Sequence, residues 1–205
     1  MRIYDISLPI ERSLAIWPGD APYALIRTCA MRDGDVVNLS ELRVSVHMGT
    51  HVDAPWHIDP GGQTVDAVAL EPYVGPAVVI DVTGLEIIRP RDIPADRLAL
   101  APRILLRTGA WADATRFPDR IPVLDESVPD YLADNGAILL GVDVPSVDAL
   151  DSADLPIHRD LNARNVRILE GLRLDDAPDG VYELFALPLK LVGSDGSPVR
   201  AILRG

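Results

Sequence analysis

The chain of 205 residues has little cysteine, few aromatic residues and a deficit of basic charge. Its single cysteine, Cys29, has no internal disulfide partner and lacks the spacing of a zinc knuckle, so we expect a small buried apolar residue there. Aromatic residues make up only 5% of the chain, which leaves the core to Val, Leu, Ile and Ala. The 19 basic and 31 acidic residues give a net charge of −12, and a surface of that sign repels nucleic-acid phosphates. We therefore expect no nucleic-acid partner.

Long apolar runs are also missing. No segment reaches the roughly 18 to 20 apolar residues that span a bilayer. Residues 1–5 begin no apolar stretch of signal-peptide length. We therefore expect no membrane partner and a cytoplasmic location. The 18 prolines and 15 glycines are spread evenly, with no repeat or low-complexity linker, which at this length favours one domain over residues 1–205.

Apolar patterning predicts nine strands and three helices. The strands are expected at residues 2–8, 23–28, 38–46, 77–82, 104–108, 138–142, 166–169, 182–187 and 201–203. The helices are expected at residues 94–100, 127–135 and about 154–165. Strands and helices that alternate along the chain indicate an α/β domain, with a mixed sheet or barrel-like core and helices outside. The order of the strands in the sheet is left open by these patterns.

Three of the four histidines, His47, His51 and His57, lie within one short segment that also contains Asp53. A lone histidine is more often a satisfied polar residue than a metal ligand, but this cluster with a carboxylate favours a metal site. Imidazole nitrogen and carboxylate oxygen suit Zn²⁺, and also Mn²⁺ or Fe²⁺. Three protein ligands with an open position are typical of a catalytic metal ion and not of a structural one.

The segment cannot be a regular helix or a straight strand. Gly49 and Pro55 disfavour the helical zinc motif, in which His47 and His51 would lie one turn apart. Alternation before the segment predicts that His47 leaves a strand on its polar face. In an extended chain His47 and His51 would be roughly 13 Å apart, whereas each ligand must approach one metal ion to about 2.1 Å. We therefore expect a bend at Gly49 and a second turn at Pro55 that redirects His57.

Two distant residues are harder to interpret from local sequence. His158 falls in the last predicted helix, where on its own it is best interpreted as a surface residue. Glu170 ends an apolar row with Val166 and Ile168. It is either a buried carboxylate, which is costly unless paired or bound to metal, or simply the end of the strand. Four acidic residues before His158 are interpreted mostly as turn and cap residues: Asp143, Asp148, Asp151 and Asp154.

The run His-x-Gly-Thr-His-x-Asp-Ala-Pro-x-His at residues 47–57 resembles the signature of the cyclase-like metal-dependent hydrolases. Further similar blocks follow the same order along nearly the whole chain: DISLPI at 5–10, WPGD at 17–20, LLRTG at 105–109, GVDVPSVD at 141–148, ILEGL at 168–172 and LPLKL at 187–191. Within the family the chain most resembles the bacterial kynurenine formamidases, or arylformamidases. Val144 stands where a Thr is expected, but it is not one of the proposed ligands.

The resemblance implies a role for each residue of the site. Two divalent metal ions, usually zinc with manganese as the alternative, would be bound by five residues: His47, His51, Asp53, His158 and Glu170. Asp53 and Glu170 would bridge the two ions. His57 would be the general acid/base, and Trp17 would help to form the substrate pocket.

The resemblance also implies a fold and an activity. The fold would be a single compact α/β domain of the swivelling β/β/α type around a mixed, barrel-like sheet, assembled as a homodimer. The reaction would be hydrolysis of the linear amide C–N bond of N-formyl-L-kynurenine to L-kynurenine and formate, a step of tryptophan degradation. Two alternatives remain open at this point. One is a related hydrolase of a cyclic amide such as isatin, and the other is a non-catalytic metal-binding protein, which would need the ligands but not His57.

Overall fold

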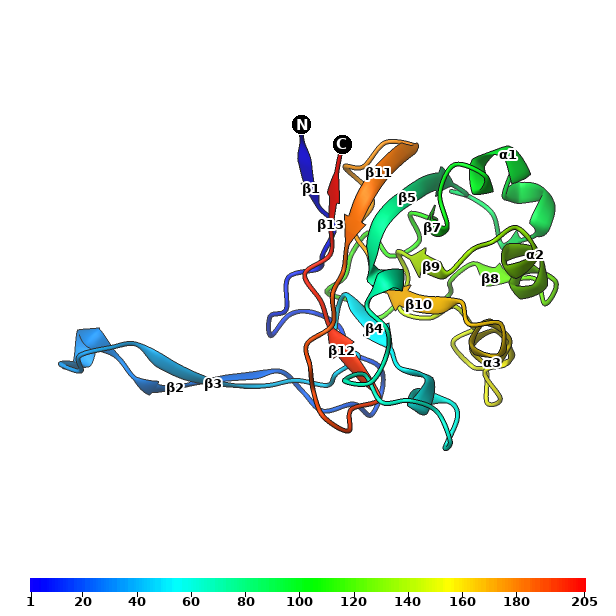
Figure 1. Cartoon of the computed structure of the whole chain (residues 1–205). Helices are drawn as coiled ribbons and strands as arrows, with labels where there is room; N and C mark the ends of the chain where they lie inside the picture. The colour runs from blue at the N-terminus through cyan, green and yellow to red at the C-terminus, as the bar shows by residue number, and fades with distance from the viewer.

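The computed structural model describes residues 1–205, and nine of its strands form one mixed sheet in the order β1-β13-β11-β5-β7-β9-β10-β4-β12 (Figure 1). Their bounds are β1 Ile3–Asp5, β4 His51–Asp53, β5 Val74–Asp81, β7 Arg103–Arg107, β9 Leu139–Val142, β10 Arg167–Glu170, β11 Gly180–Phe185, β12 Gly196–Pro198 and β13 Ile202–Arg204. The sheet has three parallel pairs, β5 with β7, β7 with β9 and β9 with β10. All its other pairs are antiparallel. The sheet curls into a half-barrel, which confirms the predicted α/β class with a barrel-like mixed sheet.

The parallel strands at the centre of the sheet are largely buried on both faces, so their sequences are almost continuously apolar. Alternation directs Val78 and Ile80 of β5 to one face, and Ala77 and Val79 to the other. Three helices cover the first face (Figure 1): α1 Ala95–Leu98, α2 Val128–Asp134 and α3 Pro156–Ala163. The second face closes on apolar residues of β4, β11 and β13. The sheet therefore separates two cores.

Each of the nine predicted strands overlaps a strand of the structure, and each of the three predicted helices overlaps a helix. Four short strands were not predicted: β4 and β12 in the main sheet, and the pair β6 Ile87–Ile88 and β8 Val123–Leu124. Four 3-10 turns complete the elements, at Met31–Asp33, Pro55–His57, Glu71–Tyr73 and Pro90–Asp92. None of the helices combines the length and the apolarity needed to cross a membrane. The cytoplasmic location stays a prediction.

A two-stranded arm, residues 24–43, projects from the body of the molecule (Figure 1). It consists of β2 Ala24–Cys29 and β3 Leu39–Arg43, and every residue of β3 is exposed. Two expectations were wrong here. Cys29 is a free, half-buried cysteine on the arm and not a core residue. The strand ends at Arg43, so His47 lies in the turn that follows and not at the end of a strand. Because the arm is exposed and packs no face against the core, its strand does not continue to His47.

Candidate metal centre

Strand register explains how distant residues meet at one end of the sheet. In the antiparallel pair of β10 and β4, Glu170 lies directly opposite His51. On the other side of β4, Asp53 lies opposite Gly196 of β12. His158 lies in the first turn of α3, which connects the parallel strands β9 and β10. The site thus forms at the carboxyl ends of parallel strands, where α/β sheets commonly bind ligands.

The histidine segment bends where the sequence predicted. Gly49 adopts φ +71°, a conformation that side chains disfavour, and its carbonyl accepts a hydrogen bond from His51 Nδ1 at 2.9 Å. Pro55 opens a 3-10 turn that ends at His57. Both predicted bends are therefore confirmed. Their effect is to fold His47 and His57 back toward the short strand that carries His51.

His51 directs its second nitrogen at two carboxylates. Because the Gly49 carbonyl can only accept, Nδ1 of His51 donates this hydrogen bond and only Nε2 faces the interior of the site. That Nε2 lies 3.3 Å from Glu170 Oε2 and 3.5 Å from Asp53 Oδ1. An imidazole nitrogen that faces two carboxylate oxygens needs a proton or a metal ion between them.

His158 repeats this arrangement from the other side. Its Nδ1 is hydrogen-bonded to Asp148 at 2.6 Å, while its Nε2 lies 3.4 Å from Glu170 Oε1 and 3.5 Å from Asp53 Oδ2. The side chain is buried, so the interpretation of His158 as a surface residue was wrong. Burial alone would lower the pKa of His158, but the carboxylates of Asp148, Asp53 and Glu170 raise it to about 12. Without a metal ion, a proton takes the position between imidazole and carboxylates.

These groups fit a divalent metal ion. Asp53 Oδ2 is buried yet accepts no hydrogen bond, which is costly for a carboxylate oxygen. Although burial opposes ionisation, the nearby His158 imidazole and the hydrogen bond from His47 hold the pKa of Asp53 well below its usual range. Glu170 is likewise buried and ionised, which favours the first of its two sequence interpretations. Ligand atoms of His47, His51 and Asp53 form one group within 4.8 Å of one another, and those of Asp53, His158 and Glu170 form a second. Asp53 belongs to both groups.

His47 and His57 share a further carboxylate, that of Asp195. His47 Nδ1 lies 3.0 Å from Asp53 Oδ1, and its Nε2 lies 2.9 Å from Asp195 Oδ2. Burial opposes protonation, but these two carboxylates raise the pKa of His47 to about 9. His57 Nδ1 is 3.5 Å from the same Asp195 oxygen, and the two imidazole rings are 4.2 Å apart. Burial lowers the pKa of His57, so this ring is neutral at pH 7.

An aromatic cleft of about 310 Å³ opens onto these histidines. Trp17, Trp111 and Phe117 line it, and the rings of Trp17 and Phe117 meet edge to face at 5.2 Å between centroids. Three of the five Trp and Phe residues of the chain thus border one cavity. Of the residues singled out from the sequence, all but Asp53 line this cleft, and Asp53 lies directly behind them in contact with His51 and His158. The structure brings the whole predicted set together.

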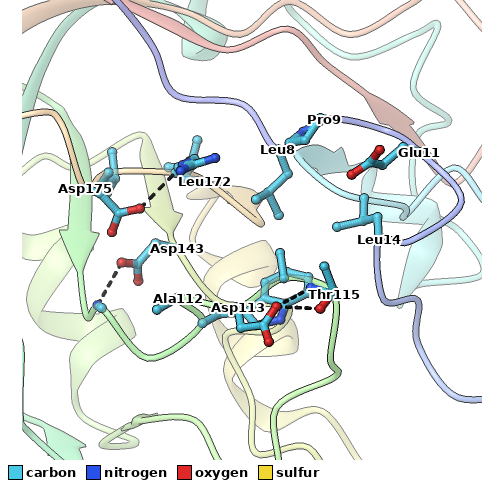
Figure 2. A pocket seen from close by; sticks show the side chains of 15 residues that line it. Leu8, Pro9, Glu11, Leu14, Ala112, Asp113, Thr115, Asp143, Leu172 and Asp175 are labelled. Carbon is cyan, nitrogen blue, oxygen red and sulfur yellow. Dashed lines mark hydrogen bonds and ion pairs between the residues drawn. The ribbon is translucent and has the colours of Figure 1, made fainter.

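A second cavity, of about 220 Å³, is also lined by Trp111 and contains no histidine. Figure 2 shows Asp143 among the residues that line it. Both oxygens of its buried carboxylate, Asp143, accept hydrogen bonds from the loop that begins at Thr108. The donors are the Thr108 N–H, the Thr108 hydroxyl and the Gly109 N–H. Asp143 therefore holds the segment that carries Trp111 and has no atom free for a ligand.

Trp111 and Phe117 of the cleft were not identified from the sequence, and neither were two carboxylates that contact the histidines, Asp148 and Asp195. Asp148 was interpreted as a turn or cap residue, and it does accept the backbone N–H groups of Ile157 and His158 at the start of α3. Its contact with the His158 ring comes from the fold and has no signal in the sequence. Asp195 lies in a polar turn that is indistinguishable from a solvated loop.

The chain matches known proteins over nearly its whole length. Residues 4–149 match the family described as "Putative cyclase". The kynurenine formamidase of Bacillus cytotoxicus is 44% identical over 200 residues, which cover 98% of this chain and 96% of that protein. Among solved structures, a potential metal-dependent hydrolase with cyclase activity superimposes with a TM-score of 0.81 at 32% identity, covering 98% of this chain and 96% of that one. Isatin hydrolase A from Labrenzia aggregata gives a TM-score of 0.82 at 25% identity, covering 98% and 93%.

Proposed function

The chain belongs to the cyclase family, and from this membership and the geometry of the cleft we propose that it is a metal-dependent kynurenine formamidase. It hydrolyses the amide C–N bond of N-formyl-L-kynurenine and releases L-kynurenine and formate. The observation that carries the proposal is the buried Asp53 Oδ2, which lacks a hydrogen bond among convergent imidazoles and carboxylates beside an aromatic cleft. An aryl formamide fits such a cleft because its ring is apolar and its acyl group is the smallest there is.

The donor set supports two divalent ions that share Asp53. One ion would be held by His47, His51 and Asp53, and the other by Asp53, His158 and Glu170. Nitrogen and oxygen donors without a thiolate suit zinc, with manganese as the alternative. Bound there, the ions supply Lewis acidity, which lowers the pKa of water and polarises the formyl carbonyl.

His57 moves the proton that the reaction requires. Because burial keeps this imidazole neutral, it can accept a proton from the attacking water as the C–O bond forms. It then donates that proton to the anilide nitrogen as the C–N bond breaks, and the formic acid product loses its own proton to solvent. Asp195 orients His57 through Nδ1. Trp17 and Phe117 pack against the aryl ring of the substrate in the cleft.

Substrate comparison tests this function against its nearest alternative. The metal-loaded protein is given N-formyl-L-kynurenine or the cyclic amide isatin at equal concentrations, and the absorbance of each product is followed. We expect rapid release of kynurenine and at least a hundredfold smaller kcat/KM for isatin. Faster turnover of isatin would instead assign the chain to the hydrolases of cyclic amides.

We also propose that the chain functions as a homodimer joined through its arm. Seven large apolar side chains are exposed on the arm: Leu25, Ile26, Met31, Val36, Val37, Leu39 and Leu42. An exposed apolar patch of this extent is typical of a protein interface. Light scattering after size-exclusion chromatography should give a dimer for the wild type and a monomer for the double variant Leu39→Asp/Leu42→Asp. The exposed apolar Val192 lies outside the arm, so Val192→Asp is the matched control and should remain dimeric.

A further inference from the structure

One carboxylate in the aromatic cleft, that of Asp20, takes no part in the metal centre. Asp20 lines the same cavity as the histidines but belongs to none of the groups that could hold a metal ion. Its side chain is half-buried and forms no hydrogen bond or ion pair with the rest of the chain. The only other acidic residue that lines the cavity, Glu170, is directed at His51 and His158. Asp20 is thus the one negative charge in the cleft that is available to a ligand.

A tight turn fixes Asp20 next to the aromatic wall. Residues 17–20 have the sequence Trp-Pro-Gly-Asp, and the Asp20 N–H donates to the Trp17 carbonyl at 3.0 Å. Gly19 has φ +98°, the left-handed conformation that a type II turn requires after proline. Because the first and fourth residues of such a turn are adjacent, an aromatic face and a carboxylate are presented together. A ligand packed on Trp17 therefore meets the charge of Asp20.

Away from the metal-binding histidines, the cleft offers no positive charge. None of its 17 lining residues is Lys or Arg, and the whole chain has a net charge of −12. Near Trp17, a ligand anion would therefore find no cationic partner, whereas a ligand cation would find Asp20. N-formyl-L-kynurenine carries an α-ammonium group on the side chain attached to its ring, ortho to the formamide.

We propose that Asp20 binds the α-ammonium group of the substrate and so selects aryl formamides with an amino-acid side chain over neutral amides. This inference rests on the proposed function of the same cleft. The formamide would reach the histidines at the inner end, the ring would lie against Trp17 and Phe117, and the ammonium would lie at Asp20 near the mouth. Isatin, which is neutral, gains nothing from this contact. Asp20 is a specificity residue and takes no part in bond breaking.

Two substrates separate this role from a general effect on the cleft. The first is N-formyl-L-kynurenine, and the second is its deamino analogue, 4-(2-formamidophenyl)-4-oxobutanoate, which differs only by the missing ammonium. For Asp20→Asn we expect KM for the first substrate to rise about tenfold with kcat little changed, the scale of one charged hydrogen bond at a partly solvated site. KM for the deamino analogue should stay as in the wild type. The exposed Asp96→Asn removes a charge far from the cleft and should change neither value.

Binding of the product separates this inference from the proposed function. The affinity of L-kynurenine, followed by quenching of tryptophan fluorescence, is compared between wild type and Asp20→Asn, and the same loss of about tenfold is expected without turnover. Equal effects of Asp20→Asn on both formamides, or no effect on either, would overturn the role of Asp20 while leaving the formamidase function intact. A wild type that hydrolyses neither formamide overturns the proposed function, and if it also fails to bind L-kynurenine it overturns the role of Asp20 as well.

Discussion

Replacement of Asp148 by Asn tests whether this buried carboxylate serves the metal centre or only the helix. Its two oxygens accept the N–H groups of Ile157 and His158 at 3.0 Å each and face His158 Nδ1 at 2.6 Å. Asparagine has one acceptor oxygen, so at least one charged hydrogen bond is lost, at a cost of about 2 kcal/mol in the free energy of unfolding. A carboxylate behind a metal-binding imidazole fixes the ring and its tautomer, and its loss typically weakens metal binding 10- to 100-fold, or about 1.4 to 2.7 kcal/mol.

Asp143→Asn is the matched control for this prediction. Asp143 lies five positions earlier in the same connection, is equally buried and accepts a comparable set of hydrogen bonds, but it contacts no histidine. Urea unfolding of the metal-free proteins at pH 7 should show similar losses of stability for both variants. Competition with a chromophoric zinc chelator should show weakened binding for Asp148→Asn alone. Equal zinc affinities in the two variants would refute the reasoning, because Asp148 would then act only as a helix cap.

Three further perturbations test other parts of the site. His57→Ala should retain its metal content but lose about 10²- to 10⁴-fold in kcat, whereas Asp53→Asn should lose the metal itself; near-normal turnover of His57→Ala at matched metal content would exclude its role as proton carrier. In the metal-free protein the pKa of His47 rises from 6.5 to about 9 and that of His158 to about 12, so calorimetry in several buffers at pH 7 should detect release of about two protons on metal binding. Protonated His47 stabilises the metal-free fold fully below about pH 6.5, and up to about 3 kcal/mol of the free energy of unfolding is lost as the pH rises through 9. A urea midpoint of the metal-free protein that does not change over this pH range would contradict the raised pKa of His47.

Much of the fold could be predicted from the sequence because most strands and helices carry their own periodicity. The buried parallel strands are apolar runs, and α2 ends before a glycine. The short strands β4 and β12 could not be predicted, since two or three residues show no period and their strand character depends on pairing with each other and with β10. The exposed strand β3 shows the opposite case, a regular pattern without burial. Its alternation resembles a half-buried strand, yet it belongs to the arm.

The residues of the candidate site also fall into those that could be predicted from the sequence and those that could not. The residues at 47–57 could be identified because their spacing is local, and the bend at Gly49 follows from the geometry that a shared ligand requires. Glu170 and His158 depended on family resemblance, since burial of a charged side chain is decided by tertiary packing. Asp195 has no local signal at all. Only the antiparallel pairing of β12 with β4 brings it to the histidines.

The central claim is that formamide hydrolysis depends on metal ions held by the two overlapping groups that share Asp53. The most direct measurement is the rate of formate release from N-formyl-L-kynurenine in protein stripped by chelator and reloaded with known amounts of zinc, with bound metal per chain determined in the same samples. The account predicts no turnover in the stripped protein and a rate that rises until two ions are bound per chain. An undiminished rate in protein shown to be free of metal would contradict it.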